Sequence, residues 1–352
     1  MELVREAHER DVERRPGASP DSPATSRDTG PATPRGPRWI RALLATAITA
    51  AIVVPLSAAA HPEVPAPPPA ALGPLTPSTL GEAYTANRAN AAQASRMAAA
   101  HGDRRRAAAD RSLAAPARHL LAFDGRGAGL ATEVFGDLAH ADRVAVVVPG
   151  SDTSLDTYAR FHTAASALHR ELTRQAPPGT RTAVVAWLGY RTPGTVSTTV
   201  LTAGRAEQAA PHLRDFVGEL RRVTGPHTRL TLVCHSYGSV VCGRAADHLA
   251  VDDIALIGSP GTGADKASAL HTPARVWAAR GSEDWVGEVP HVRADLFVTT
   301  LGFGTDPVSP AFGARVFDAG DAAHSGYFTP GSTALTNLAR IVLGDTSEVT
   351  HD

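Results

Sequence analysis

Apolar residues recur in short uninterrupted runs along most of the chain, and amphipathic stretches lie between the runs. Such runs are typical of strands that are buried on both faces of a parallel sheet. They predict strands at 119–124, 130–135, 143–149, 181–187, 229–234, 253–258, 274–279 and 313–318. The stretches between them predict helices near 155–175, 204–223, 238–250 and 332–343. This alternation predicts an α/β domain over residues 118–345, with a mostly parallel sheet covered by helices.

The first part of the chain follows other patterns. Residues 1–38 are rich in Arg, acidic residues and Pro and have almost no large apolar side chains, so we expect disorder there. Residues 61–78 hold seven prolines, which is typical of an extended linker. Residues 79–117 are rich in Ala and predict one or two helices, broken near Gly102. Because the apolar face of these helices is mostly Ala, we expect them to pack on the domain that follows.

A membrane-directed segment is predicted at residues 39–60, which include nineteen consecutive residues without a charge. Arg35, Arg38 and Arg41 precede the apolar stretch, an arrangement that sends the following chain across a membrane. The segment fits a signal peptide cut after Ala58–Ala60, an uncleaved anchor, or, as a third reading, a buried helix of a soluble protein. We therefore expect an extracytoplasmic protein, either secreted or anchored by residues 39–60.

Composition and motifs exclude several classes of protein. The formal net charge of −1 argues against a strongly basic nucleic-acid binder. Two cysteines are too few for a disulfide framework or a four-cysteine zinc module. No metalloprotease or calcium-loop pattern occurs, and neither glycine-rich stretch completes a phosphate-binding or dinucleotide-binding motif. We expect no metal, no organic cofactor and no nucleic-acid partner.

The most informative motif is Cys234-His-Ser-Tyr-Gly238, which follows an apolar strand and precedes a helix. It fits the nucleophile elbow G-x-S-x-G, with Cys at the first Gly position. Small residues on both sides of the serine let strand and helix approach, while a tight, strained turn holds the hydroxyl clear of the sheet. Ser236 is therefore the predicted nucleophile, and an ordinary strand–helix turn is the alternative.

A serine nucleophile needs a base, and the base needs an acid that orients it. Behind an elbow of this kind, acid and His follow the Ser in that order, each at the carboxyl end of a strand. Asp284 and His324 hold these two positions. Asp306 and Glu283 are rival acids, and His291 is a rival base that lies only seven residues after Asp284.

Two backbone N–H groups are candidates to stabilise an oxyanion. One belongs to Tyr237, directly after the predicted nucleophile. The other belongs to Ser151, in the loop after an early strand, where Gly150 lets the backbone turn inward. A simple Pro-Gly turn is the alternative for the second position.

Six segments carry a family resemblance: Val147–Gly150, His235–Val240, Gly258–Gly261, Phe312–Arg315, His324–Tyr327 and Tyr327–Ser332. With them, the span from Arg118 to Asp345 resembles the α/β-hydrolase fold and is similar to the actinobacterial α/β-hydrolase family of unknown function. The resemblance implies a serine nucleophile with Asp and His partners, no metal or cofactor, and no known substrate. The sequence departs from the pattern at Cys234, in place of Gly, and at Glu283-Asp-Trp285, in place of Gly-Asp-Pro.

Other side chains leave alternatives open. Cys234 and Cys242 straddle Ser236 and form either a disulfide or two small buried thiols. Four aromatic residues near strand ends form either pocket walls or core: Trp187, Tyr190, Trp285 and Phe303. The stretch 188–204 is a candidate short cap.

Together these features predict an extracytoplasmic serine hydrolase that cleaves an ester, or an amide, in a small-molecule, lipid-like or peptide-like acyl substrate. Two alternatives remain. One is an inactive hydrolase-fold binding protein of the cell envelope, and the other is an acyltransferase that uses the same three residues.

Overall fold

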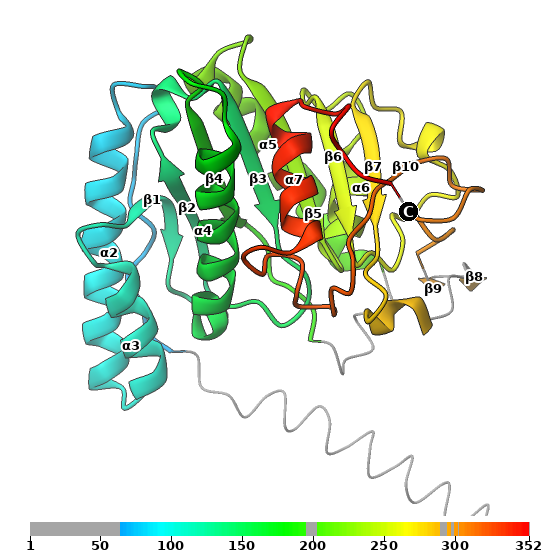
Figure 1. Cartoon of the computed structure of the whole chain (residues 1–352). Coiled ribbons are helices and arrows are strands. Elements are labelled where there is room, and N and C mark those ends of the chain that lie inside the picture. Colours follow the sequence, from blue (N-terminus) through cyan, green and yellow to red (C-terminus); the bar gives the residue numbers. More distant parts are fainter. Residues whose placement is uncertain (1–63, 195–202, 289–293, 297–298, 302, 352) are drawn as a thin grey trace, which may run out of the picture. The chain divides into compact units, whose positions relative to one another are not determined.

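Buried runs of Val, Leu, Ile and Ala form a twisted eight-stranded sheet in the order β1-β2-β4-β3-β5-β6-β7-β10 (Figure 1). Its strands are β1 (His119–Asp124), β2 (Leu130–Gly136), β3 (Arg143–Val148), β4 (Thr182–Leu188), β5 (Arg229–His235), β6 (Asp253–Ile257), β7 (Arg275–Ala279) and β10 (Arg315–Val316). Neighbouring strands from β4 to β10 are parallel, whereas β2 pairs antiparallel with both β1 and β4. The predicted mostly parallel sheet is therefore confirmed.

This computed structural model describes residues 64–194, 203–288, 294–296, 299–301 and 303–351. The predicted disordered segment 1–38 and the predicted membrane-directed segment 39–60 lie outside the described residues. Within the described ranges, no helix combines the length and the apolar character that a membrane span requires. Residues 64–76 form neither helix nor strand.

Helices cover both faces of the sheet. Helices α4 (Tyr158–Gln175) and α7 (Thr333–Leu343) lie on one face, and α5 (Gly204–Thr224) and α6 (Gly238–Ala245) lie on the other (Figure 1). The buried side chains accordingly form two cores, and successive residues of β3 alternate between them.

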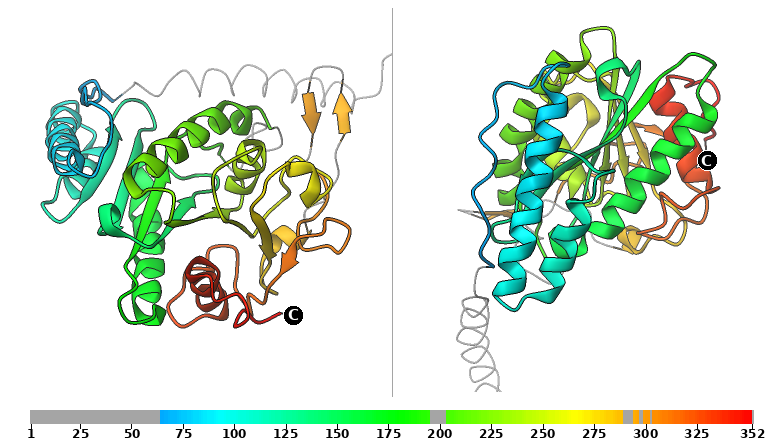
Figure 2. Two further views of the ribbon diagram at one scale, coloured as in Figure 1. Left: turned by 90° about the horizontal axis from the view of Figure 1, so that it is seen from above. Right: turned by 90° about the vertical axis from the view of Figure 1, so that its left-hand side faces the viewer.

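The Ala-rich segment forms helices α2 (Leu80–Ala100) and α3 (Arg104–Leu113), which cover the β1 edge of the sheet (Figure 2). Helix α2 packs with its buried alanines on β1, and Asn87 Nδ2 donates hydrogen bonds to Leu120 O and Leu121 O. An edge strand exposes unpaired backbone groups, and α2 shields those of β1.

Two local expectations were wrong, and one strand pair was not predicted. The helix expected over 238–250 ends at Ala245, and the chain then turns with His248 in the left-handed region at φ 52°. The strand expected over 313–318 pairs with β7 only at Arg315–Val316, at the edge of the sheet. A separate antiparallel pair, β8 (Ala294–Leu296) with β9 (Thr299–Leu301), has no counterpart among the predicted strands.

Candidate active site

Ser236 sits in a strained turn between β5 and α6. Its φ of 54° lies in the left-handed region, which non-glycine residues rarely adopt. A methyl group at Gly238 would lie 2.6 Å from Val148 O, so only glycine lets the start of α6 approach β3 this closely. The serine thus stands at the carboxyl edge of the sheet, in the strand–turn–helix arrangement that the sequence motif predicts.

The structure brings Ser236, His324 and Asp284 into one hydrogen-bonded chain. His324 Nε2 lies 3.0 Å from Ser236 Oγ, and His324 Nδ1 lies 2.9 Å from Asp284 Oδ1. A carboxylate only accepts hydrogen bonds, so Nδ1 carries the proton of the neutral imidazole and Nε2 accepts from the Ser236 hydroxyl. The three side chains follow β5, β7 and β10, whose carboxyl ends lie at the same edge of the sheet.

Asp284 is held as an anion by three donors. Besides His324, the backbone N–H of Val286 donates to Oδ1 at 2.9 Å, and the hydroxyl of Tyr327 donates to Oδ2 at 2.6 Å. Burial alone would raise the pKa of Asp284, but these hydrogen bonds outweigh it and hold the pKa below its usual value. The Tyr327 hydroxyl in turn accepts from the N–H of Gly281 at 3.1 Å, so both partners of this buried phenol are fixed.

A glycine at the end of β6 makes room for the acid and the base. A methyl group at Gly258, whose φ is 53°, would lie 2.7 Å from Asp284 Oδ2 and 3.2 Å from His324 Nδ1. Strand β6 lies between β5 and β7 in the sheet, so the Asp–His pair has to pass over its end to reach Ser236. Only a residue without a side chain leaves that path open.

His235 supports the backbone of the histidine loop. Its Nε2 lies 2.7 Å from His324 O, and because a carbonyl only accepts, Nε2 carries the proton. Burial, together with the neighbouring His324 ring, lowers the pKa of His235 to about 4, so this imidazole is neutral in the physiological range. The sequence motifs alone assign no role to His235 or to Tyr327. Both lie in segments that carry the family resemblance, and that was the one signal for them.

The two rival acids, Asp306 and Glu283, do not join this chain of hydrogen bonds. Asp306 pairs with Arg280 at 2.5 Å, Glu283 is exposed to solvent, and His291 lies outside the described residues. In the described part of the chain, no group of three or more His, Cys, Asp and Glu side chains is placed to hold a metal ion.

A cavity of about 480 Å³ opens beside the serine, and Ser236 and His324 form part of its wall. The loop after β3 approaches so closely that a methyl group at Gly150 would lie 2.6 Å from Ser236 Cβ. Ser151 and Tyr237, the two predicted oxyanion donors, line the same cavity. The loop therefore brings Gly150 next to Ser236, and Ser151 follows it in the wall of the cavity.

The four aromatic candidates divide between pocket and core. Trp285 and Phe303 line the cavity, and the half-exposed Trp285 ring lies 4.7 Å from the His324 ring. Trp187 and Tyr190 instead stack on each other in the core, at 6.0 Å between ring centroids. Residues 195–202 of the predicted cap lie outside the described residues.

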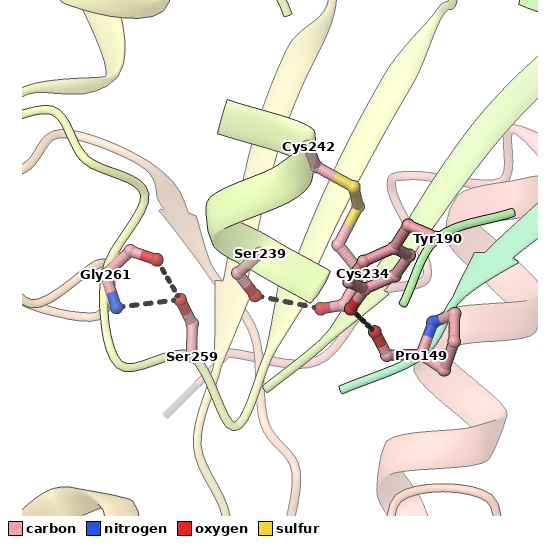
Figure 3. The surroundings of a disulfide bond; sticks show 7 residues. All are labelled: Pro149, Tyr190, Cys234, Ser239, Cys242, Ser259 and Gly261. Atoms are coloured by element: carbon pink, nitrogen blue, oxygen red, sulfur yellow. Dashed lines mark hydrogen bonds between the residues drawn. A yellow bond between two sulfur atoms is a disulfide. The ribbon is translucent and has the colours of Figure 1, made fainter. Parts of the chain in front are cut away.

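Cys234 and Cys242 form a disulfide that joins the end of strand β5 to helix α6 (Figure 3). Both cysteines are fully buried, and Ser239 Oγ donates a hydrogen bond to Cys234 O at 3.0 Å in the same turn. Of the two readings that the sequence left open, the structure contains the disulfide. The two cysteines flank Ser236 in the sequence, so the bridge links the strand and the helix that hold Ser236 in place.

Comparison with known proteins finds one family model and uncharacterized mycobacterial relatives. A family model described as alpha/beta hydrolase matches residues 124–294, which include Ser236 and Asp284 and end before His324. The uncharacterized protein Rv2079 of Mycobacterium tuberculosis is 29% identical over 265 residues, which cover 66% of this chain and 40% of that protein. The uncharacterized protein Rv0963c of the same species is 34% identical over 149 residues, 40% of this chain and 56% of that protein. The matches thus span less than two thirds of the length of these relatives.

Solved structures that resemble this chain include esterase PE8, with a TM-score of 0.40 and 17% sequence identity. The match covers 60% of this chain and 97% of that chain. Another is XC6422 from Xanthomonas campestris, described as an a/b serine hydrolase without lid, with a TM-score of 0.36 and 19% sequence identity. The match covers 62% of this chain and 88% of that chain. The sheet order and the family match together show that this chain has an α/β-hydrolase fold and resembles the alpha/beta hydrolase family over residues 124–294.

Proposed function

We propose that the chain is a serine hydrolase that cleaves a carboxylic ester with Ser236 as nucleophile. One observation carries the proposal: an unbroken chain of hydrogen bonds runs from Ser236 Oγ through the His324 ring to the Asp284 carboxylate, in the wall of a cavity. Such a chain matches the geometry by which a base activates a serine and an acid orients the base.

In the proposed reaction, Ser236 Oγ attacks the ester carbonyl carbon while His324 Nε2 takes the hydroxyl proton. The carbonyl π electrons move to the oxygen, and the backbone N–H groups of Tyr237 and Ser151 stabilise the resulting anion. Collapse of this intermediate breaks the bond to the alcohol, which leaves with the proton from His324. A water molecule then repeats the two steps on the acyl-enzyme and releases the acid.

Asp284 has an electrostatic and an orienting role in this scheme. Its carboxylate fixes the imidazole tautomer in which Nε2 is free to accept a proton, and it stabilises the imidazolium that forms. The lowered pKa of Asp284 keeps the carboxylate charged across the neutral range.

The inactive binding protein is the weaker alternative. It requires that His324 lie out of reach of Ser236, whereas Nε2 and Oγ are 3.0 Å apart. The acyltransferase shares every step up to the acyl-enzyme and differs only in the acceptor, so product analysis with an added alcohol separates it from the hydrolase.

Hydrolysis of p-nitrophenyl butyrate tests the proposal. We expect turnover by the wild-type chain and a loss of kcat of at least about a thousandfold in Ser236→Ala and in His324→Ala. Glu283→Gln is the matched control, because Glu283 is an exposed neighbour of Asp284 outside the hydrogen-bonded chain, and it should keep wild-type activity. Equal rates in wild type and Ser236→Ala would exclude Ser236 as the nucleophile.

We also propose that the hydrolase acts outside the cytoplasm. The uncharged stretch 42–60, which three arginines precede, supports this location, and so does the buried disulfide, a feature typical of oxidising compartments. Fractionation of cells that express the full chain should place it in the envelope or the medium, with no thiol that reacts after denaturation. A cytosolic chain with two free thiols would contradict the location.

A further inference from the structure

The cavity beside Ser236 extends over the carboxyl edge of the sheet from one face to the other. On the α4 side it is lined by Val147, Phe161 and Phe328, which belong to or pack on the core beneath α4 and α7. On the other side it is lined by Tyr237 and Phe303, which belong to the core beneath α5 and α6. Ser236 therefore lies between two apolar regions that are built from different cores.

Both regions are fixed by packing. Phe161 and Val147 are buried within the α4-side core, and the Tyr237 and Phe303 rings meet edge to face at 5.7 Å between centroids. Preformed apolar walls of this kind bind apolar groups without first paying for their own ordering.

The permanently charged residues of the cavity wall are exposed to solvent. Among the described residues that line the cavity, Asp152 and Arg160 are the ones from the Asp, Glu, Lys and Arg class, and both are exposed to solvent. The other titratable wall residues are His324, Tyr237, Tyr327 and the neutral His235. An ionised group carried into this region would lose its hydration and find no opposite charge there.

We infer that the substrate is an uncharged ester with apolar groups on both the acyl and the alcohol side of the scissile bond. The inference rests on the proposed function and adds the substrate class. One apolar group lies against α4 and the other against Tyr237 and Phe303, with the ester between them at Ser236. The volume of about 480 Å³ falls in the lower half of the usual range for ligand pockets, which fits short and medium chains better than long ones.

Two series of esters test the substrate class. Each methylene that becomes buried should raise kcat/KM about fourfold, so p-nitrophenyl butyrate should exceed the acetate by about fifteenfold. The p-nitrophenyl ester of succinic acid, of similar length but with a terminal carboxylate, should be at least about tenfold slower than the butyrate. In the alcohol series, hexyl butyrate should exceed methyl butyrate when acid release is followed by titration.

A variant of α4 locates one of the two regions. Ala164 lines the cavity, so Ala164→Phe should lower kcat/KM for p-nitrophenyl octanoate at least about tenfold more than for p-nitrophenyl acetate. Ala159→Phe is the control, because Ala159 is exposed on the same helix and does not line the cavity; it should leave the series unchanged.

Labelling of Ser236 by a fluorophosphonate separates the two possible failures. If Ser236 is labelled but the chain-length series is flat, or the succinate ester is hydrolysed as fast as the butyrate, the substrate class is wrong and the nucleophile stands. If Ser236 is not labelled and no ester is hydrolysed, the proposed function fails and the substrate class fails with it.

Discussion

At the scale of single residues, the site depends on contacts that remove freedom from Asp284 and His324. Tyr327 and the N–H of Val286 occupy the carboxylate oxygens, and His235 holds the carbonyl of His324. Each contact leaves the imidazole with one orientation, toward Ser236. Positioning by such neighbours matters because small displacements of reacting groups reduce rates strongly.

Tyr327→Phe should lower kcat while leaving KM nearly unchanged. The variant removes a hydrogen bond to a buried carboxylate, worth about 1.5–3 kcal/mol, and the loss corresponds to roughly ten- to hundredfold in rate if it is felt in the transition state. The rate should be expressed per active site, titrated with a fluorophosphonate, so that partial unfolding does not count as lost catalysis.

Tyr84→Phe, on α2 and away from the cavity, is the control for loss of a phenol hydroxyl. If kcat per titrated site is the same in Tyr327→Phe and wild type, Tyr327 has only a structural role.

Gly258→Ala should disable the site by crowding. The new methyl group would press on Asp284 Oδ2 and His324 Nδ1, and overpacking of this kind costs about 1–3 kcal/mol. Gly179→Ala is the matched control, because Gly179 also has a positive φ, 86°, but has open space around it. Urea unfolding should show a backbone-strain cost in both variants and the additional overpacking cost in Gly258→Ala, and kinetics should show a loss of kcat in Gly258→Ala alone. Equal kcat in the two variants would contradict the crowding.

At the scale of elements, two contacts fix the turn at Ser236 between β5 and α6. One is the close packing of α6 on β3, and the other is the disulfide between β5 and α6. The bridge closes a short loop, with a sequence separation of 8, around the strained Ser236. It replaces the glycine of the usual motif by a residue that links the same two elements covalently.

Removing the bridge should therefore lower the free energy of unfolding. For a loop of this length, the loss of the cross-link corresponds to about 2–3 kcal/mol. Urea unfolding of the wild type with and without a reductant measures it, and a variant with both Cys234→Ala and Cys242→Ala is the control that a reductant should not affect. If the wild type unfolds at the same urea concentration after complete reduction, the bridge does not stabilise the fold.

The sequence alone predicts the elements that depend on local pattern, and it predicts Asp284 and His324 from their positions after strands. It misses contacts between distant loops that no such position rule covers. Strand β5 and the turn at Ser236 follow from an apolar run next to small residues, so both could be predicted. The roles of His235 and Tyr327 arise where loops 89 and 43 residues apart meet, and no local pattern encodes that approach. The sequence does not decide between a disulfide and two thiols at Cys234 and Cys242 for the same reason, since their spacing permits a bridge without requiring it.

At the scale of the molecule, the N-terminal helices are joined to the region of the site by a buried arginine. Arg106 of α3 donates two hydrogen bonds to Gly127 O, at 3.0 and 2.6 Å, and its Nε lies 3.5 Å from Asp156 Oδ1. Asp156 follows the loop that carries Ser151, so the helical segment braces the loop that borders the cavity.

Asp110, which lies beside Arg106, makes the stability of the folded chain depend on pH. Burial raises the pKa of Asp110 to about 7, even though Arg106 Nε lies 3.8 Å away and acts in the opposite direction. A carboxyl whose pKa is higher in the folded chain favours folding when protonated, so its contribution is full below about pH 4 and is lost as pH rises through about 7. Asp110→Asn should match the wild type near pH 4 and exceed its stability at pH 8.

Urea unfolding at several pH values measures this difference. Glu82→Gln, at an exposed position of α2, should leave the pH dependence of the wild type unchanged. A variant Asp110→Asn that is less stable than the wild type at pH 8 would show that an ionised Asp110 stabilises the fold through Arg106.

The most direct test of the whole account is the mass of the protein after exposure to a fluorophosphonate, followed by mapping of the modified peptide. The account predicts one adduct per chain, on Ser236, and strongly slowed labelling in His324→Ala. A correctly folded, disulfide-bonded wild-type chain that takes up no adduct, or one modified at another residue, would contradict it.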